Sequence, residues 1–117
     1  MKTAGPNPEL PRIAVGVATN VYAIAAIGTS MVKIGASSNP AGRVTAFQIG
    51  CPLELRLLGN WWGGSLVENY LHHAFATKRV RGEWFDFKDE DPLPLIEATV
   101  EKAVRYIARQ PPKMIRC

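Results

Sequence analysis

The sequence predicts an α+β fold, a small and mainly antiparallel sheet of about three strands with helices packed against it. Two apolar, β-leaning runs flank a short glycine-containing turn, which is the pattern of a β-hairpin. A third alternating stretch follows, and further segments carry apolar residues at helical spacing. A chain of 117 residues with 47% apolar residues can form one domain with a buried core.

The predicted hairpin occupies residues 20–35. A two-residue turn that begins at Gly28 suits type II′ geometry, in which glycine comes first. This register places Tyr22 opposite Gly35. Because side chains alternate between the faces of a sheet, Tyr22, Lys33 and Gly35 then share one face. A turn shifted by one residue would separate Tyr22 from Lys33.

The next elements follow from their turn and capping residues. Residues 37–39 offer N-caps for a helix from Pro40 to about Gln48, with proline in the first turn and Val44 and Phe47 buried. Residues 53–62 alternate imperfectly and indicate a third strand. Whether residues 13–17 form an extra strand remains open.

Two more helices are expected in the second half. The first begins at Ser65, ends near Thr77 and buries one apolar side. That side consists of Leu66, Val67, Tyr70, Leu71, Ala74 and Phe75. A basic turn (78–82) and a short extended piece (83–87) follow, and Asp91 can cap a final helix from Pro92 to about Arg109. The predicted organisation is therefore a flexible arm (1–12), a single domain (13–110) and a C-terminal tail (111–117).

The basic charge is concentrated in the first part of the chain. The net charge is +4, and residues 1–82 carry eight lysines and arginines against three acidic residues. Residues 83–117 carry six against seven. This distribution suits a phosphate-binding face, although ordinary solubility explains it equally well.

The cysteines and the apolar N-terminal run exclude some classes of protein. Cys51 and Cys117 have neither a metal-binding spacing nor a disulfide framework, so a reduced, cytoplasmic protein is expected. Residues 13–27 are mostly apolar, but a membrane span needs about 20 residues. Asn20 and Tyr22 also interrupt this run, so neither a signal peptide nor a membrane partner is expected.

Four short motifs resemble the GIY-YIG nuclease superfamily, and most closely its small phage-associated branch. They are Val21-Tyr22 followed after ten residues by Lys33-Ile34-Gly35, then Ser37 to Arg43, Leu66 to His72, and Arg81-Gly82-Glu83-Trp84-Phe85. The resemblance covers roughly residues 20 to 87. Asn20 replaces the first glycine of the superfamily pattern and Lys33 its second tyrosine.

The resemblance implies a metal-dependent endonuclease that hydrolyses DNA phosphodiester bonds. Tyr22 would activate water, Lys33 would assist it, Arg43 would hold the scissile phosphate, and Glu68 would bind one Mg²⁺ or Mn²⁺ ion. A free tyrosine has a pKa near 10, so Tyr22 needs nearby cations, and Lys33 and Arg43 are the candidates. Each of these residues also has a structural interpretation: a packed tyrosine, a solvated lysine or a surface arginine.

Glu68 and His72 are the paired candidates on the second helix. At positions i and i+4 they lie side by side and could jointly hold a hydrated Mg²⁺ ion, with His72 as a proton acceptor or a secondary group. The alternatives are a buried, hydrogen-bonded histidine and a capping box in which Ser65 and Glu68 satisfy each other's backbone groups.

Lys78, Arg79 and Arg81 suit contacts to nucleic-acid phosphates without reading sequence. The second function compatible with the sequence is therefore a non-catalytic nucleic-acid-binding module on the same fold, and the third is a homo-oligomer formed through Trp61 and Trp62. DNA is the expected partner, with RNA not excluded. The preferred nucleic-acid structure, the oligomeric state, the pathway and the role of Glu83 are not defined by the sequence.

Overall fold

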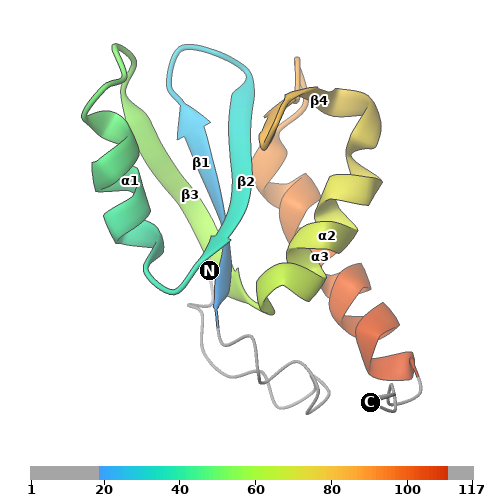
Figure 1. Cartoon of the computed structure of the whole chain (residues 1–117). Helices are drawn as coiled ribbons and strands as arrows, with labels where there is room; N and C mark the ends of the chain where they lie inside the picture. The colour runs from blue at the N-terminus through green and yellow to red at the C-terminus, as the bar shows by residue number, and fades with distance from the viewer. Residues whose placement is uncertain (1–18, 111–117) are drawn as a thin grey trace.

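The computed structural model describes residues 19–110, which form one sheet and three α-helices. The predicted arm at 1–12, the segment 13–17 and the tail at 111–117 lie outside the described residues. Figure 1 shows α1 beside one side of the sheet, with α2 and α3 on the other. Within residues 19–110, no helix is both long enough and apolar enough to cross a lipid bilayer.

The α+β class is confirmed, but the sheet has five strands rather than three. The strands are β1 (Asn20–Ala26), β2 (Met31–Ser37), β3 (Leu55–Trp62), β4 (Arg79–Arg81) and β5 (Trp84–Asp86). Their spatial order is β3-β1-β2-β5-β4, and every neighbouring pair is antiparallel. The two additional strands have only three residues each, which is too short for an alternating pattern to reveal them.

The predicted basic turn at 78–82 therefore contains a strand. Lys78 ends the short 3₁₀ helix η2 (Ala76–Lys78), and β4 then pairs with β5 across a turn at Gly82, whose φ is 55°. The positive φ explains why this tight turn uses glycine. The turn matters for function because Glu83 lies between the two strands.

The register predicted for the first hairpin is confirmed. Tyr22 pairs with Gly35, and Ile24 pairs with Lys33. The predicted turn type is not observed, because the Thr29 N–H donates to the Ala26 carbonyl at 3.1 Å. Gly28 is the third residue of this turn with a φ of 91°, the position at which a type II turn requires a positive φ.

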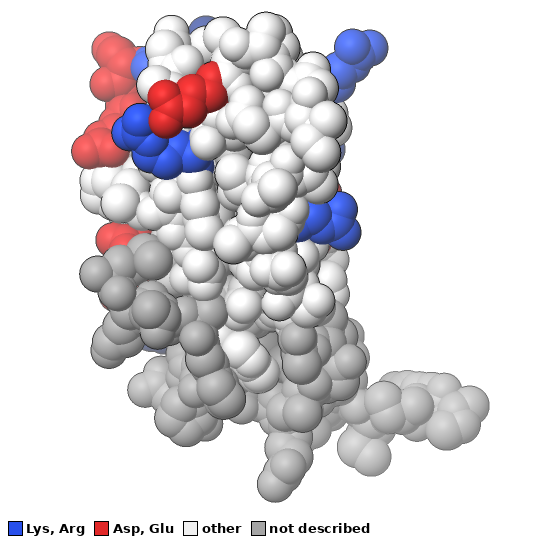
Figure 2. Space-filling model, turned by 90° about the vertical axis from the view of Figure 1, so that its left-hand side faces the viewer, with Lys and Arg blue, Asp and Glu red and all other residues white. Residues whose placement is uncertain are grey.

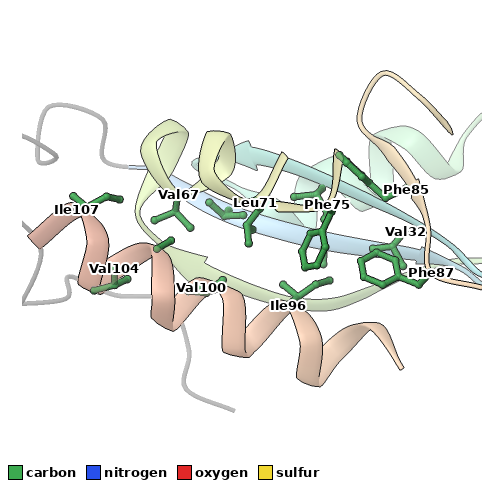
Figure 3. Close-up of a cluster of buried hydrophobic side chains, with 14 residues drawn as sticks. Val32, Val67, Leu71, Phe75, Phe85, Phe87, Ile96, Val100, Val104 and Ile107 are labelled. Atoms are coloured by element: carbon green, nitrogen blue, oxygen red, sulfur yellow. The ribbon is translucent and has the colours of Figure 1, made fainter. Parts of the chain in front are cut away.

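The main core lies between the sheet and two helices, α2 (Gly64–Ala74) and α3 (Pro92–Arg109). Figure 3 shows Val67, Leu71 and Phe75 from the α2 region and residues of α3 meeting the side chains of the sheet. The buried α3 residues recur at the helical spacing that the sequence predicted. They are Ile96, Val100, Ala103, Val104 and Ile107.

The second helix differs from its prediction in detail. It ends at Ala74, and Leu66 and Ala74 are exposed rather than buried. Its N-cap is Gly63, with a φ of 143° and no side-chain capping hydrogen bond. The capping box predicted for Ser65 and Glu68 is therefore wrong, because Ser65 already lies inside the helix.

The opposite face of the sheet is covered by α1 (Pro40–Gln48), the helix with the predicted bounds. The Asn39 side chain caps it by accepting from the Gly42 N–H at 3.1 Å. Val44 and Phe47 of α1 pack, partly buried, against a second cluster. That cluster consists of Tyr22, Ile24, Ala26 and Leu55. Tyr22, Lys33 and Gly35 thus share the face that α1 covers, as the register requires.

Candidate functional site

The candidate site lies where β2 loses its strand neighbour. The pairing of β2 with β5 extends from Met31 to Lys33, and one further backbone bond joins the Ile34 N–H to the Glu83 carbonyl at 2.9 Å. The Ile34 carbonyl is bound instead by Nε2 of His72, also at 2.9 Å. A side chain of α2 therefore occupies the next position of the ladder, which brings α2 against the open end of β2.

Gly35 is the bare backbone position at the centre of this site. A Cβ atom built there would lie 2.6 Å from Cζ of Tyr22 and 2.7 Å from Oε1 of Glu83. Those distances are shorter than any ordinary carbon contact, so a side chain at position 35 would displace both neighbours. Glycine is needed here because a phenol and a carboxylate lie directly over the strand.

Lys33 is held on the same face by three groups. Its Nζ atom lies 3.6 Å from Oε1 of Glu83, 4.6 Å from the ring centre of Phe47 and 5.5 Å from that of Trp84. An ammonium over aromatic faces gains cation–π attraction in addition to the ion pair. Lys33 thus has a defined position and is not the freely solvated strand lysine of the alternative interpretation.

Glu68 and His72 approach the site from α2. The His72 Nε2 atom lies 3.9 Å from Oε2 of Glu68, and their side chains are 17% and 15% exposed. Because a carbonyl oxygen can only accept, the bond to Ile34 requires that Nε2 carries the hydrogen. The proposed role of His72 as proton acceptor or metal ligand is therefore unavailable at Nε2 in this arrangement, and only Nδ1 retains a lone pair.

Tyr22 is only 2% exposed, and its environment opposes ionisation. Burial and the negative charge of Glu83 raise the pKa of Tyr22 to about 12, and the Arg43 charge lowers it only in part. Lys33 neutralises Glu83 rather than stabilising a phenolate. In this arrangement the hydroxyl remains protonated at neutral pH, and the activation of water by Tyr22 stays a prediction.

Burial, and then the nearby charge of Glu83, raise the pKa of the Glu68 carboxyl, while His72 lowers it. Two nearby carboxyl groups repel each other when both are ionised, and a bound cation would offset this repulsion. Their oxygen atoms are ligands that Mg²⁺ accepts, with water completing the shell. Among residues 19–110 no three histidine, cysteine or acidic side chains form a metal-binding group, so an ion would rest on very few protein ligands.

Arg43 lies in the first turns of α1, exposed to solvent, with its guanidinium carbon 6.0 Å from the ring centre of Phe47. It is close enough to Tyr22 for its charge to act on the phenol. Figure 2 views the molecule from the side of α1 and shows a mostly uncharged surface with few lysines and arginines. The visible surface on this side is therefore not broadly basic.

The three predicted phosphate-binding residues behave differently from one another. Lys78 forms an ion pair with Glu90 and lies 5.4 Å from the ring centre of Phe87, so its charge is partly used. Arg79 lies 5.4 Å from the ring centre of Phe85, and both Arg79 and Arg81 are exposed on β4. The two arginines remain available for contacts with a charged partner.

Glu83 is the site residue whose role the sequence did not define. It contacts Lys33 and acts on both Tyr22 and Glu68. Its position depends on two strands too short to predict from alternation. The signals in the sequence are its place in the motif from Arg81 to Phe85 and its position directly after the turn glycine, Gly82.

The small antiparallel sheet thus has a tyrosine, a lysine and two glutamates near its open end. The chain belongs to the T5orf172 domain family, a phage-associated family whose model matches residues 13–108. The comparisons with curated proteins and with solved structures gave no match.

Proposed function

We propose that this domain is a metal-dependent DNA endonuclease of the GIY-YIG type. The observation that carries the proposal is that Tyr22 lies against the bare backbone of Gly35, where Glu83 also lies. Lys33 pairs with that Glu83, and the charge of Glu68 is close enough to act on the phenol. Membership of a phage-associated, nuclease-like family supports it. RNA is an alternative substrate that the same phosphate chemistry would accept.

In this proposal the chain's own residues bind and orient the reacting groups. Arg43, near the N-terminus of α1, holds the scissile phosphate through its guanidinium group. Tyr22 stays protonated and orients the attacking water through its hydroxyl group, and Lys33 adds a fixed positive charge. Glu68 would hold Mg²⁺ or Mn²⁺, and the bound ion would supply positive charge near the leaving oxygen.

A nucleic-acid-binding module without turnover is the second candidate. One observation favours it: the raised pKa of Tyr22, which opposes the formation of a phenolate base. It needs only Arg79, Arg81 and Arg43 to contact phosphates, and it makes no demand on Glu68.

Nicking of supercoiled plasmid by the purified protein, with and without Mg²⁺ or Mn²⁺, distinguishes the two functions. We expect metal-dependent nicking that Glu68→Gln abolishes, because the amide lacks the charge that holds the ion. Tyr22→Phe should also abolish nicking, since it deletes only the hydroxyl group. Both variants should retain DNA binding.

Glu101→Gln is the matched control, because it removes one negative charge from an exposed position of α3, away from the site. It should nick DNA at the parent rate. A parent protein that nicks no DNA with either metal, or a Glu68→Gln variant as active as the parent, contradicts the nuclease proposal and leaves the binding module.

A further inference from the structure

We propose that Glu83 is the positioning residue of this site, which fixes the Lys33 ammonium and the Tyr22 hydroxyl in place for cleavage. The inference rests on the nuclease function proposed above. It assigns a task to Glu83, which lies on the turn between β4 and β5 and belongs to no strand or helix.

The contacts of Glu83 converge on one oxygen atom. Oε1 of Glu83 lies 3.6 Å from Nζ of Lys33, and the same atom lies close above Gly35, where a Cβ would come within 2.7 Å. The Tyr22 ring lies against the same bare position, and the charge of Glu83 acts on the Tyr22 hydroxyl. A single carboxylate therefore pairs with Lys33 and lies beside the same glycine as the Tyr22 ring.

The surroundings of Lys33 show why it needs such a contact. A lysine has four rotatable bonds, and the rings of Phe47 and Trp84 confine it without fixing its direction. The ion pair with Glu83 adds the direction. Phe47 belongs to α1, the helix that carries Arg43, and Glu83 directly precedes β5. The contacts of Lys33 therefore also connect α1 to the hairpin of β4 and β5.

The backbone of Glu83 is itself hydrogen-bonded to β2. Its carbonyl accepts the Ile34 N–H at 2.9 Å, the last backbone bond on this edge of β2. The side chain thus starts from a fixed point beside Gly35. This anchoring distinguishes a positioning residue from a surface glutamate that meets a lysine by chance.

The test compares Glu83→Gln with the parent in single-turnover nicking at saturating protein concentration. The amide keeps the volume and loses the charge that holds Lys33. We expect the nicking rate to fall by about 10²-fold, the loss typical of a small misplacement of catalytic groups. The dissociation constant for DNA should stay within about twofold, because Lys33 and Tyr22 are not replaced. Glu101→Gln, with the same charge change, should keep the parent rate.

A double-mutant cycle with Lys33→Met shows whether Glu83 acts through Lys33. We expect Glu83→Gln to slow the Lys33→Met protein much less than it slows the parent, because the group that it holds is already absent. Equal slowing in both backgrounds contradicts the inference, as does a Glu83→Gln variant that nicks at the parent rate.

A measurement without DNA gives an independent test. The rings of Phe47 and Trp84 should shift the NMR signals of the Lys33 ε-protons away from those of a free lysine. In Glu83→Gln these signals should move toward the free value, and unchanged signals contradict the inference. If Glu83→Gln does not fold, Glu83→Asp, whose carboxylate is one methylene shorter, takes its place. A parent protein that does not nick contradicts the proposed function, whereas nicking that is indifferent to Glu83 contradicts only this inference.

Discussion

At the level of the single residue, the proposed metal site and the stability of the fold favour different forms of Glu68. The metal site needs the charged carboxylate, whereas the fold favours the protonated carboxyl. Burial and Glu83 raise the pKa of its carboxyl group, so the folded state binds this proton more tightly than the unfolded state does. The group therefore favours folding below its unfolded pKa, and this stability is lost as the pH rises through the raised folded pKa. At neutral pH the charged Glu68 is a cost to the fold.

Glu68→Gln should accordingly raise the melting temperature at pH 7 and leave it nearly unchanged at about pH 4, where the carboxyl is largely protonated in both states. Each unit of raised pKa corresponds to about 1.4 kcal/mol of stability at pH 7. Thermal denaturation across this pH range measures the effect. A variant that melts below the parent at pH 7 would show that the charge of Glu68 supports the fold.

Tyr22 gives a second residue-scale prediction, through its pKa of about 12. Replacing Tyr70 and Tyr106 by Phe leaves Tyr22 as the single tyrosine, because the chain has three. The phenolate absorbance of that protein should appear only near pH 12. A midpoint near the ordinary value of about 10 would mean that the phenol is far less shielded than its burial indicates.

At the level of elements, the N-caps of α1 and α3 differ in whether their side chains bond to the helix. The Asn39 side chain caps α1, whereas Asp91 occupies the N-cap position of α3 without a side-chain hydrogen bond. Asn39→Ala should therefore lower the free energy of unfolding by about 1 kcal/mol, the usual cost of a lost cap. Asp91→Ala should cost clearly less in the same chemical denaturation experiment. Equal losses would mean that the hydrogen bond of Asn39 contributes nothing beyond its position.

The sequence predicted the elements whose own pattern is long enough to read. The first hairpin, α1 and α3 appear with the expected register or bounds, because alternation, a proline after capping residues and an eighteen-residue apolar stripe are local signals. The three-residue strands β4 and β5 have no such signal, and their pairing comes from packing: Phe85 and Phe87 are fully buried. The capping box at Ser65 failed because the helix already begins at Gly64, with Gly63 as its N-cap.

Only part of the candidate site could be predicted from the sequence. Tyr22, Lys33 and Gly35 could be placed together from the hairpin register, and Glu68 and His72 from helical spacing. Glu83 could not, because only tertiary contacts bring its turn over Gly35. The raised pKa of Tyr22 could not be predicted either, because it depends on burial and on the charge of Glu83.

The charge distribution of the whole molecule predicts how binding responds to salt. If β4 contacts phosphates, the affinity for duplex DNA should fall with a slope of about 0.9 per neutralised phosphate on a logarithmic plot. Replacing Arg79 and Arg81 by Ala should reduce that slope by about 2 without changing sequence preference. Replacing Arg105 and Arg109 of α3 is the matched control and should leave it unchanged. A salt-independent affinity contradicts phosphate binding.

The open end of β2, where His72 replaces a strand neighbour, has a consequence for folding kinetics. The groups that meet there come from β1, β2, α2 and the turn after β4, so many residues separate them along the chain. Contacts of large sequence separation form late, because the loops between them must close first. Helices α1 and α3 can begin from local interactions, whereas the site exists only in a chain that has finished folding. Its completeness is thus a stricter measure of the native state than helix content is.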